Sequence, residues 1–147
     1  MLLSQTAHYA LRAVYYLVSS DDSKWHLTKE VAEITKIPAP YLARILSNLA
    51  KRGILQSRTG MGGGFSVSEE GLNTSLYEVV AQFDNLEKIC NCVFGFSEYC
   101  SNDEDSKCIL HDKWADLKNQ LIETFKNCTL KDLKEQSFCP DWSRIKV

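Results

Sequence analysis

The sequence predicts a mainly α-helical protein with one small β-hairpin, arranged as a winged helix-turn-helix that is followed by a long C-terminal dimerisation helix. Apolar residues recur every three or four positions in several segments of the 147-residue chain, which is the period of helices that pack on one face. Pro38 and Pro40 separate two of these segments. A turn with four glycines, residues 60–64, follows closely and lies between two short strand-like runs.

Two helices are predicted before the prolines. The first covers residues 4–18, where one helix face carries Leu11, Val14, Tyr15 and Val18. Asp21 and Asp22 then interrupt the pattern. Thr28 suits the N-cap of a shorter second helix that reaches about residue 35, because its hydroxyl can accept a hydrogen bond from a free amide of the first turn.

A third helix is predicted from Pro40 to Arg52. Proline cannot continue a helix, because it lacks the amide donor and restricts the residue before it, but Pro40 suits the first position of a new one. One face of this helix is apolar at i, i+3, i+4 and i+7: Leu42, Ile45, Leu46 and Leu49. The opposite face repeats that spacing with hydrogen-bonding groups: Arg44, Ser47, Asn48 and Lys51. The helix therefore packs on one side and offers donors on the other.

The segment after the third helix has the pattern of a wing. Gly53 suits the helix end, and strand-like runs at 54–57 and 65–67 flank the glycine turn. Glycines allow a backbone to approach a phosphate and sugar surface closely. The turn lacks the Gly-Lys-Ser/Thr ending of a nucleotide-binding loop, which disfavours that alternative. Another helix is predicted at 75–83.

The charge pattern favours duplex DNA as the partner of this half. The whole chain has a net charge of −2, yet residues 34–68 contain five Lys or Arg and no Asp or Glu. The second helix of a helix-turn-helix enters the major groove while surrounding groups hold phosphates. The residues that we expect to contact DNA are Thr28, Pro40, Tyr41, Arg44, Ser47, Asn48, Lys51, Arg58, Thr59, Gly62 and Gly63.

The second half predicts a loop and then a dimerisation helix. Residues 85–106 lack any period, whereas from about residue 109 to 128 apolar residues alternate in steps of four and three: Leu110, Trp114, Leu117, Leu121 and Cys128, with Phe125 beside them. We call this set without Phe125 the seam. Such a seam most simply packs against a second copy, so we expect a homodimer that binds a palindromic operator. The tail, 129–147, carries no functional signal.

The cysteines predict metal or thiol chemistry. Arg12 interrupts the apolar run near the N-terminus, so we expect neither a signal peptide nor a membrane span, and a cytoplasmic protein. In a reducing compartment the six cysteines are thiols or metal ligands rather than disulfides. Four of them lie within 19 residues: Cys90, Cys92, Cys100 and Cys108. Zinc, an iron-sulfur cluster and a metal-free thiol switch are the alternatives.

Several motifs, taken in order, resemble the bacterial winged-helix regulators of the IscR/NsrR family. These are residues 9–13 (YALRA), 41–49, the wing at 60–65 (GMGGGF), and 108–111 (CILH) followed by Trp114. The resemblance implies a homodimeric transcription regulator, expected to be a repressor, that senses redox, iron-sulfur status or nitric oxide through a cluster. Ala43 and Thr59 stand where the family carries operator-reading residues, so no operator sequence is implied.

The same resemblance implies the cluster ligands. Three cysteines and a histidine three residues beyond the last correspond to Cys92, Cys100, Cys108 and His111, although the intervals between the cysteines are longer here. In the nitric-oxide-sensing branch the fourth ligand comes from the first helix of the partner, where this chain has His8. Cys90 is an alternative to Cys92. The iron count, two or four, stays open.

These predictions divide the chain into four parts: a DNA-binding domain at 1–85, a cysteine-rich sensor loop at 86–108, the dimerisation helix at 109–128 and the tail at 129–147. An enzyme is not expected, because no Ser-His-Asp set, no paired carboxylates in an apolar setting and no nucleotide motif are present. A small redox protein that uses the cysteine loop is the rival hypothesis.

Overall fold

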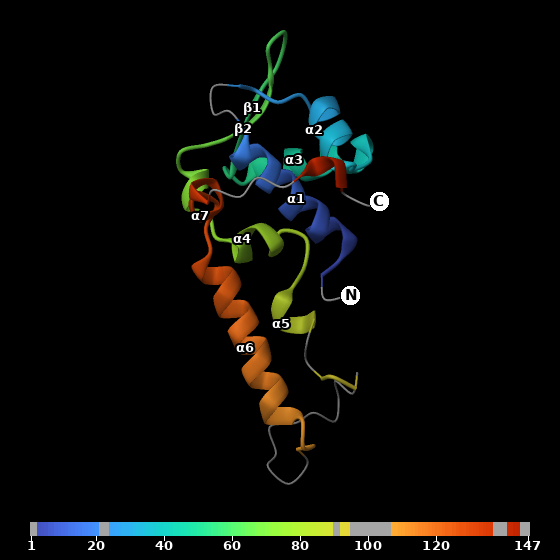
Figure 1. Cartoon of the computed structure of the whole chain (residues 1–147), viewed down its shortest axis with the longest axis vertical. Coiled ribbons are helices and arrows are strands. Elements are labelled where there is room, and N and C mark those ends of the chain that lie inside the picture. The colour runs from blue at the N-terminus through green and yellow to red at the C-terminus, as the bar shows by residue number, and fades with distance from the viewer. Residues whose placement is uncertain (1–2, 21–23, 90–91, 95–106, 137–140, 145–147) are drawn as a thin grey trace.

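The computed structural model describes residues 3–20, 24–89, 92–94, 107–136 and 141–144. A helical head carries a projecting hairpin at one end, and a long helix, α6, leads away from the other end (Figure 1). The elements in chain order are α1 (Gln5–Ser19), α2 (Thr28–Thr35), α3 (Ala39–Lys51), β1 (Leu55–Arg58), β2 (Gly64–Val67), η1 (Gly71–Asn73), α4 (Leu76–Val80), α5 (Leu86–Ile89), α6 (His111–Asn127), α7 (Leu130–Glu135) and η3 (Trp142–Arg144). The predicted class, mainly helical with a two-stranded wing, is confirmed.

Helix α1 begins where its polar neighbours satisfy its free amides. The Ser4 hydroxyl accepts a hydrogen bond from the Ala7 amide at 3.2 Å, and Asp84 accepts one from the Ser4 amide at 2.7 Å. The apolar face of α1 is buried against α3, α4 and α7. The cap fixes the start of the helix, so α1 lies within one residue of the predicted 4–18.

The helix-turn-helix follows with one difference from prediction. Leu27, with extended backbone, is the N-cap of α2, and no side chain caps that end. The prediction of Thr28 as the N-cap is wrong, because the Val31 amide already bonds the Leu27 carbonyl and Thr28 becomes the first helical residue. Lys36, at φ 56°, ends α2 in the left-handed region before Pro38 starts α3. Helix α3 begins at Ala39, so Pro40 is its second residue and not its first as predicted.

The wing is an antiparallel hairpin whose register pairs Leu55 with Val67 and Arg58 with Gly64. Gly53, at φ 79°, turns the chain out of α3 into β1 as expected. The hairpin is tied to the head by two 2.9 Å hydrogen bonds, from the His26 amide to the Phe65 carbonyl and from the Phe65 amide to the His26 carbonyl. Strand β2 is therefore bonded to the segment before α2 at Phe65, in the half of the hairpin nearer the turn.

The C-terminal elements tie α6 back to the head. The Leu76 amide donates to the Cys128 carbonyl at 2.8 Å, and the Leu130 amide donates to the Thr74 carbonyl at 2.9 Å. Thr129 and Asp132 form a capping box that starts α7. Two short helices thus lie in segments for which no regular structure was predicted, α5 and α7. No helix in the described part of the chain is long and apolar enough to cross a membrane.

The main core lies among α1, α2, α3 and the wing, and a smaller cluster joins α1, α4, α5 and α6. Leu46 of α3 is 0% exposed in the main core. We expect Leu46→Ala to lower the free energy of unfolding by about 2–5 kcal/mol, since it removes a buried side chain and leaves a cavity. Urea denaturation measures the loss. Leu27→Ala, at a position 56% exposed, is the control and should change it by less than about 0.5 kcal/mol; equal losses would contradict the assigned core.

Candidate nucleic-acid interface and cysteine site

Helix α3 separates its two faces as its sequence predicts. The apolar stripe is buried: Leu42, Ile45, Leu46 and Leu49. On the other side Arg44, Ser47 and Lys51 are exposed, and Asn48 is half-buried. Pro40 and Tyr41 are exposed in the first turn. In the described residues no carboxylate lies within 4.0 Å of Arg44 or Lys51, so their charges face solvent.

The start of α2 and the turn after it flank this face. Thr28 is half-buried at the first position of α2, where a free backbone amide is also available. Lys36 is exposed in the turn between α2 and α3. Lys36 belongs to the basic segment but not to the expected contacts, because its place in the turn depends on its left-handed backbone.

The wing offers backbone and one basic side chain. Arg58 ends β1 and is exposed, as are Thr59, Gly60 and Gly62. Gly60 and Gly62 have φ of 91° and 73°, values that a side chain disfavours, and the Gly63 amide donates to the Gly60 carbonyl at 3.1 Å. Met61, whose side chain is fully exposed, stands at the tip. Between them these residues present main-chain amides and few side chains to a partner.

Gly63 is where the closed shape of the wing can be tested. A Cβ at Gly63 would lie 2.2 Å from the Arg58 carbonyl oxygen, whereas a Cβ at Gly62 would have nothing within 4 Å. Because that oxygen belongs to the paired strand, relieving the overlap opens the hairpin. We expect Gly63→Ala to weaken DNA binding by about tenfold or more, roughly 1.4 kcal/mol, in a fluorescence anisotropy titration.

Gly62→Ala is the matched control for this substitution. It strains the backbone, since φ is 73° there, but it creates no overlap, and we expect a smaller loss of affinity. Circular dichroism should show the same helix content in both variants. If both alanines bound DNA as tightly as the parent protein, the wing would not contact DNA.

The candidate cysteine ligands lie between α5 and α6 in the sequence. Cys92 is half-buried, Cys108 is exposed, and His111 is the half-buried first residue of α6. The His111 amide donates to the Cys108 carbonyl at 3.0 Å, so a thiol and an imidazole lie within one turn. Cys90 and Cys100 lie outside the described residues. In the part that is described no three His, Cys, Asp or Glu side chains converge, but thiolates with an imidazole match the chemistry of iron-sulfur and zinc sites.

The structure places His8 far from the other candidates of the same chain. His8 is exposed on α1 and lines a groove with Phe125, near the C-terminal end of α6. His111 stands at the other end of that helix, 14 residues earlier, which at 1.5 Å per residue is about 21 Å. Within one chain His8 therefore cannot share an ion with Cys108. It could do so only from a partner subunit.

Cys128 differs from the candidate ligands. It is half-buried directly after α6, and burial raises the pKa of its thiol, with Asp132 adding to the effect. A raised pKa disfavours the thiolate that binds metals. Cys128 thus suits a packing role.

Two of the five seam residues, Leu110 and Leu117, are exposed within the chain, and the other three are half-buried. Ile122 is buried and Phe125 half-buried, because they face α4 and α5. Leu117, in the middle of the seam, is 55% exposed, and Leu110 is 37% exposed. Figure 1 shows α6 leading away from the head, and Leu110 and Leu117 add exposed apolar surface to this part of the chain.

Comparison with known proteins agrees with this architecture. A family model described as "Rrf2: Iron-dependent Transcriptional regulator" matches residues 3–136. A putative HTH-type transcriptional regulator of Aquifex aeolicus is 37% identical over 90% of this chain and 91% of its own length. The HTH-type transcriptional regulator NsrR of Shouchella clausii is 30% identical over 90% of this chain and 88% of its own length.

Solved structures share the fold at low identity. CymR, the global cysteine regulator of B. subtilis, superposes with a TM-score of 0.68 at 18% identity, over 90% of this chain and 95% of that one. IscR of T. potens superposes with a TM-score of 0.67 at 18% identity, over 96% of this chain and 94% of that one. The winged-helix fold is common to all of them.

Proposed function

This chain belongs to the Rrf2 family of transcriptional regulators, and from that premise we propose that it is a homodimeric repressor that recognises a palindromic operator. The observation that carries the proposal is the outward face of α3, where Arg44 and Lys51 stand without a carboxylate partner in the described residues, beside a glycine wing. DNA-binding regulators are what the matched family contains. The operator, the dimer and the direction of regulation are the parts we propose.

In this proposal α3 enters the major groove of each half-site. Its leading residues, Tyr41 and Arg44, face base edges, and Lys51 holds a phosphate farther along. The Arg58 side chain and the Gly62 backbone lie along the phosphates of the adjacent DNA strand. Gly63, also an expected contact, is buried and instead holds the turn closed through its hydrogen bond to Gly60. The remaining expected contacts, Thr28, Pro40, Ser47, Asn48 and Thr59, border the same surface.

We further propose that Cys92, Cys100 and Cys108 hold an iron-sulfur cluster. The fourth ligand is His111, or His8 of the partner subunit, whose place on α1 excludes it from its own chain's site. Such a cluster would respond to oxidants, nitric oxide or iron-sulfur status. Structural zinc on the same donors, or a metal-free thiol switch, is the second candidate.

A route from this site to the DNA face exists in the hydrogen bonds that leave α6. Its C-terminal end bonds α4 through the Cys128 carbonyl and the segment before α4 through Leu130. From there, the Ser68 hydroxyl bonds both the Gly71 amide and the Gly53 carbonyl, between α3 and β1. In this proposal a shift of α6 would therefore displace the segment between the recognition helix α3 and strand β1.

The test begins with DNA sites selected from a random duplex pool. Against the recovered site we expect Arg44→Ala to weaken binding by about 10- to 100-fold, the loss of one bidentate base contact worth roughly 1–3 kcal/mol. Fluorescence anisotropy at several salt concentrations measures this loss. If the salt dependence of binding instead fell by about one released ion, Arg44 would hold a phosphate and not a base.

Lys113→Ala is the control for Arg44→Ala. It removes the same charge from an exposed position near the start of α6, at the far end of the molecule from α3 (Figure 1). Its affinity should stay within about twofold of the parent. Equal losses from the two substitutions would mean that net charge, and not α3, determines binding.

A further inference from the structure

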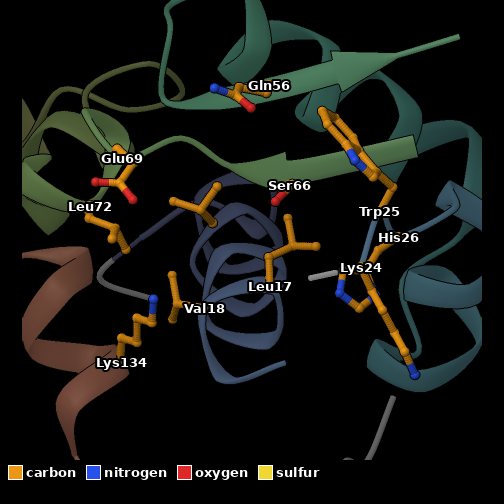
Figure 2. Close-up of a pocket in the computed structure, with 11 residues that line it drawn as sticks. Leu17, Val18, Lys24, Trp25, His26, Gln56, Ser66, Glu69, Leu72 and Lys134 are labelled. Atoms are coloured by element: carbon orange, nitrogen blue, oxygen red, sulfur yellow. The ribbon is translucent and has the colours of Figure 1, made fainter. Parts of the chain in front are cut away.

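A pocket of about 250 Å³ lies between the wing, the C-terminal end of α1 and α7. Strand residues Gln56 and Ser66, which pair across the hairpin, form one wall, and Leu17 and Val18 of α1 form the opposite one (Figure 2). The volume is just below the range of common small-molecule sites and suits a metabolite of a few heavy atoms. Neither the DNA face nor the cysteine site uses this pocket.

Opposite charges stand at one end of the pocket. Figure 2 shows Glu69 and Lys134 at the same end, with Leu72 beside them. Glu69 is exposed, and no cationic group in the described chain lies within 4.0 Å of its carboxylate. A lysine ammonium has three donors, so Lys134 can bind a ligand besides any partner within the chain. This end can bind an ammonium and a carboxylate together.

The other end holds a buried imidazole with unused hydrogen-bonding capacity. His26 is 4% exposed, and neither of its ring nitrogens has a hydrogen-bond partner among the residues that the structure describes. Its Nδ1 lies 3.6 Å from a Glu30 carboxylate oxygen, too far for a hydrogen bond. Leaving such a buried polar group unpaired is unfavourable. His26 lines the pocket, but each ring nitrogen has less than 1 Å² of accessible surface, so the ring must turn toward the pocket before a ligand can supply the partner.

We propose that this pocket binds a free α-amino acid with a polar side chain. The ammonium of the ligand pairs with Glu69 and its carboxylate with Lys134. The aliphatic part crosses Leu17 and Val18, and the polar end reaches His26. The zwitterion matches a site with both charges at one end, and neither a simple anion nor a simple amine uses both.

Such a ligand would act on the wing. The pocket wall is the hairpin itself, and His26 also holds β2 through both backbone bonds to Phe65. A bound amino acid thus bridges α1, the His26 segment and β2, and it would fix the wing relative to α3. This regulatory part rests on the proposed function, whereas binding does not.

The experiment uses the full-length protein without DNA and the standard amino acids one at a time. Isothermal titration calorimetry should find at least one polar amino acid with Kd at or below about 1 mM, roughly −4 kcal/mol. Glu69→Gln should weaken that binding by about tenfold. Glu70→Gln, which changes the adjacent exposed carboxylate outside the pocket, should leave it unchanged. Both positions are exposed, so neither change threatens folding.

Three results would overturn the proposal: no binding of any amino acid up to about 10 mM, equal affinity in Glu69→Gln and the parent, or equal binding of the matching amine that lacks the carboxylate. A final arm repeats the operator titration with the amino acid present. An unchanged operator Kd would overturn the effector role while leaving the binding site. Failure of the protein to bind any DNA would overturn the proposed function and leave the calorimetry intact.

Discussion

Leu117→Glu is expected to convert the protein from a dimer into a monomer and to weaken operator binding by at least about 100-fold. Leu117 lies at the centre of the seam and is 55% exposed in the single chain, so the change removes no contact from the chain's own core. In a paired α6 the new carboxylate would lose its hydration without a partner. A monomer binds each half-site separately and forfeits the gain from linking two recognition helices.

Sedimentation equilibrium measures the mass, and anisotropy with the selected site measures the affinity. Asn119→Glu places the same charge two residues away, about 200° around α6 and off the seam, at an exposed position. This variant should remain dimeric and bind the operator normally. If Leu117→Glu kept the dimer mass, the seam would not be the interface. If it became monomeric with unchanged operator affinity, cooperation between two copies would not contribute to recognition.

The helices and the wing could be predicted because each is specified by its own local sequence. The stripe from Leu42 to Leu49 determines both the length of α3 and which side faces out, so the exposure of Arg44 follows from periodicity alone. The glycines likewise mark the wing, since Gly62 and Gly64 adopt φ values that other residues avoid. These parts of the fold and the candidate DNA face needed no knowledge of distant contacts.

The tail could not be predicted because its packing is long-range. Leu130 is fully buried, and the Trp142 ring packs tilted against Tyr15 and edge-on against Tyr16, with ring centroids 5.9 and 5.6 Å away. A six-residue helix shows too little of the helical period to be distinguished from a loop. These contacts join segments more than 100 residues apart, and no local pattern records them.

The same limit applies to two parts of the candidate sites. The separation of His8 from His111 depends on how α1 packs against the far end of α6, which spacing along the chain does not determine. The pocket at Glu69 and His26 is formed by α1, the wing and α7 together, so neither residue had a signal in the sequence. Sequence patterns predicted single elements well and predicted surfaces shared between elements poorly.

Cys108→Ala is expected to abolish metal binding at the cysteine site. It removes one of three thiolates, and the remaining donors cannot complete the coordination of a cluster. Protein purified without oxygen should lose nearly all iron, sulfide and visible absorption that the parent carries. Zinc in place of iron in the parent protein would support the second candidate, and no metal in either would support a thiol switch.

The matched control is Cys128→Ala, since this thiol is half-buried, has a raised pKa and lies outside the proposed ligands. It should keep the full metal content, and equal loss from both variants would contradict the assigned ligands. His111→Ala and His8→Ala then separate the two candidates for the fourth ligand: substitution of the true ligand should lower the stability of the bound metal, and the other substitution should not.

Comparing Cys108→Ala with the holoprotein on the selected operator tests sensing itself. Equal operator affinities would mean that metal binding does not control the DNA face.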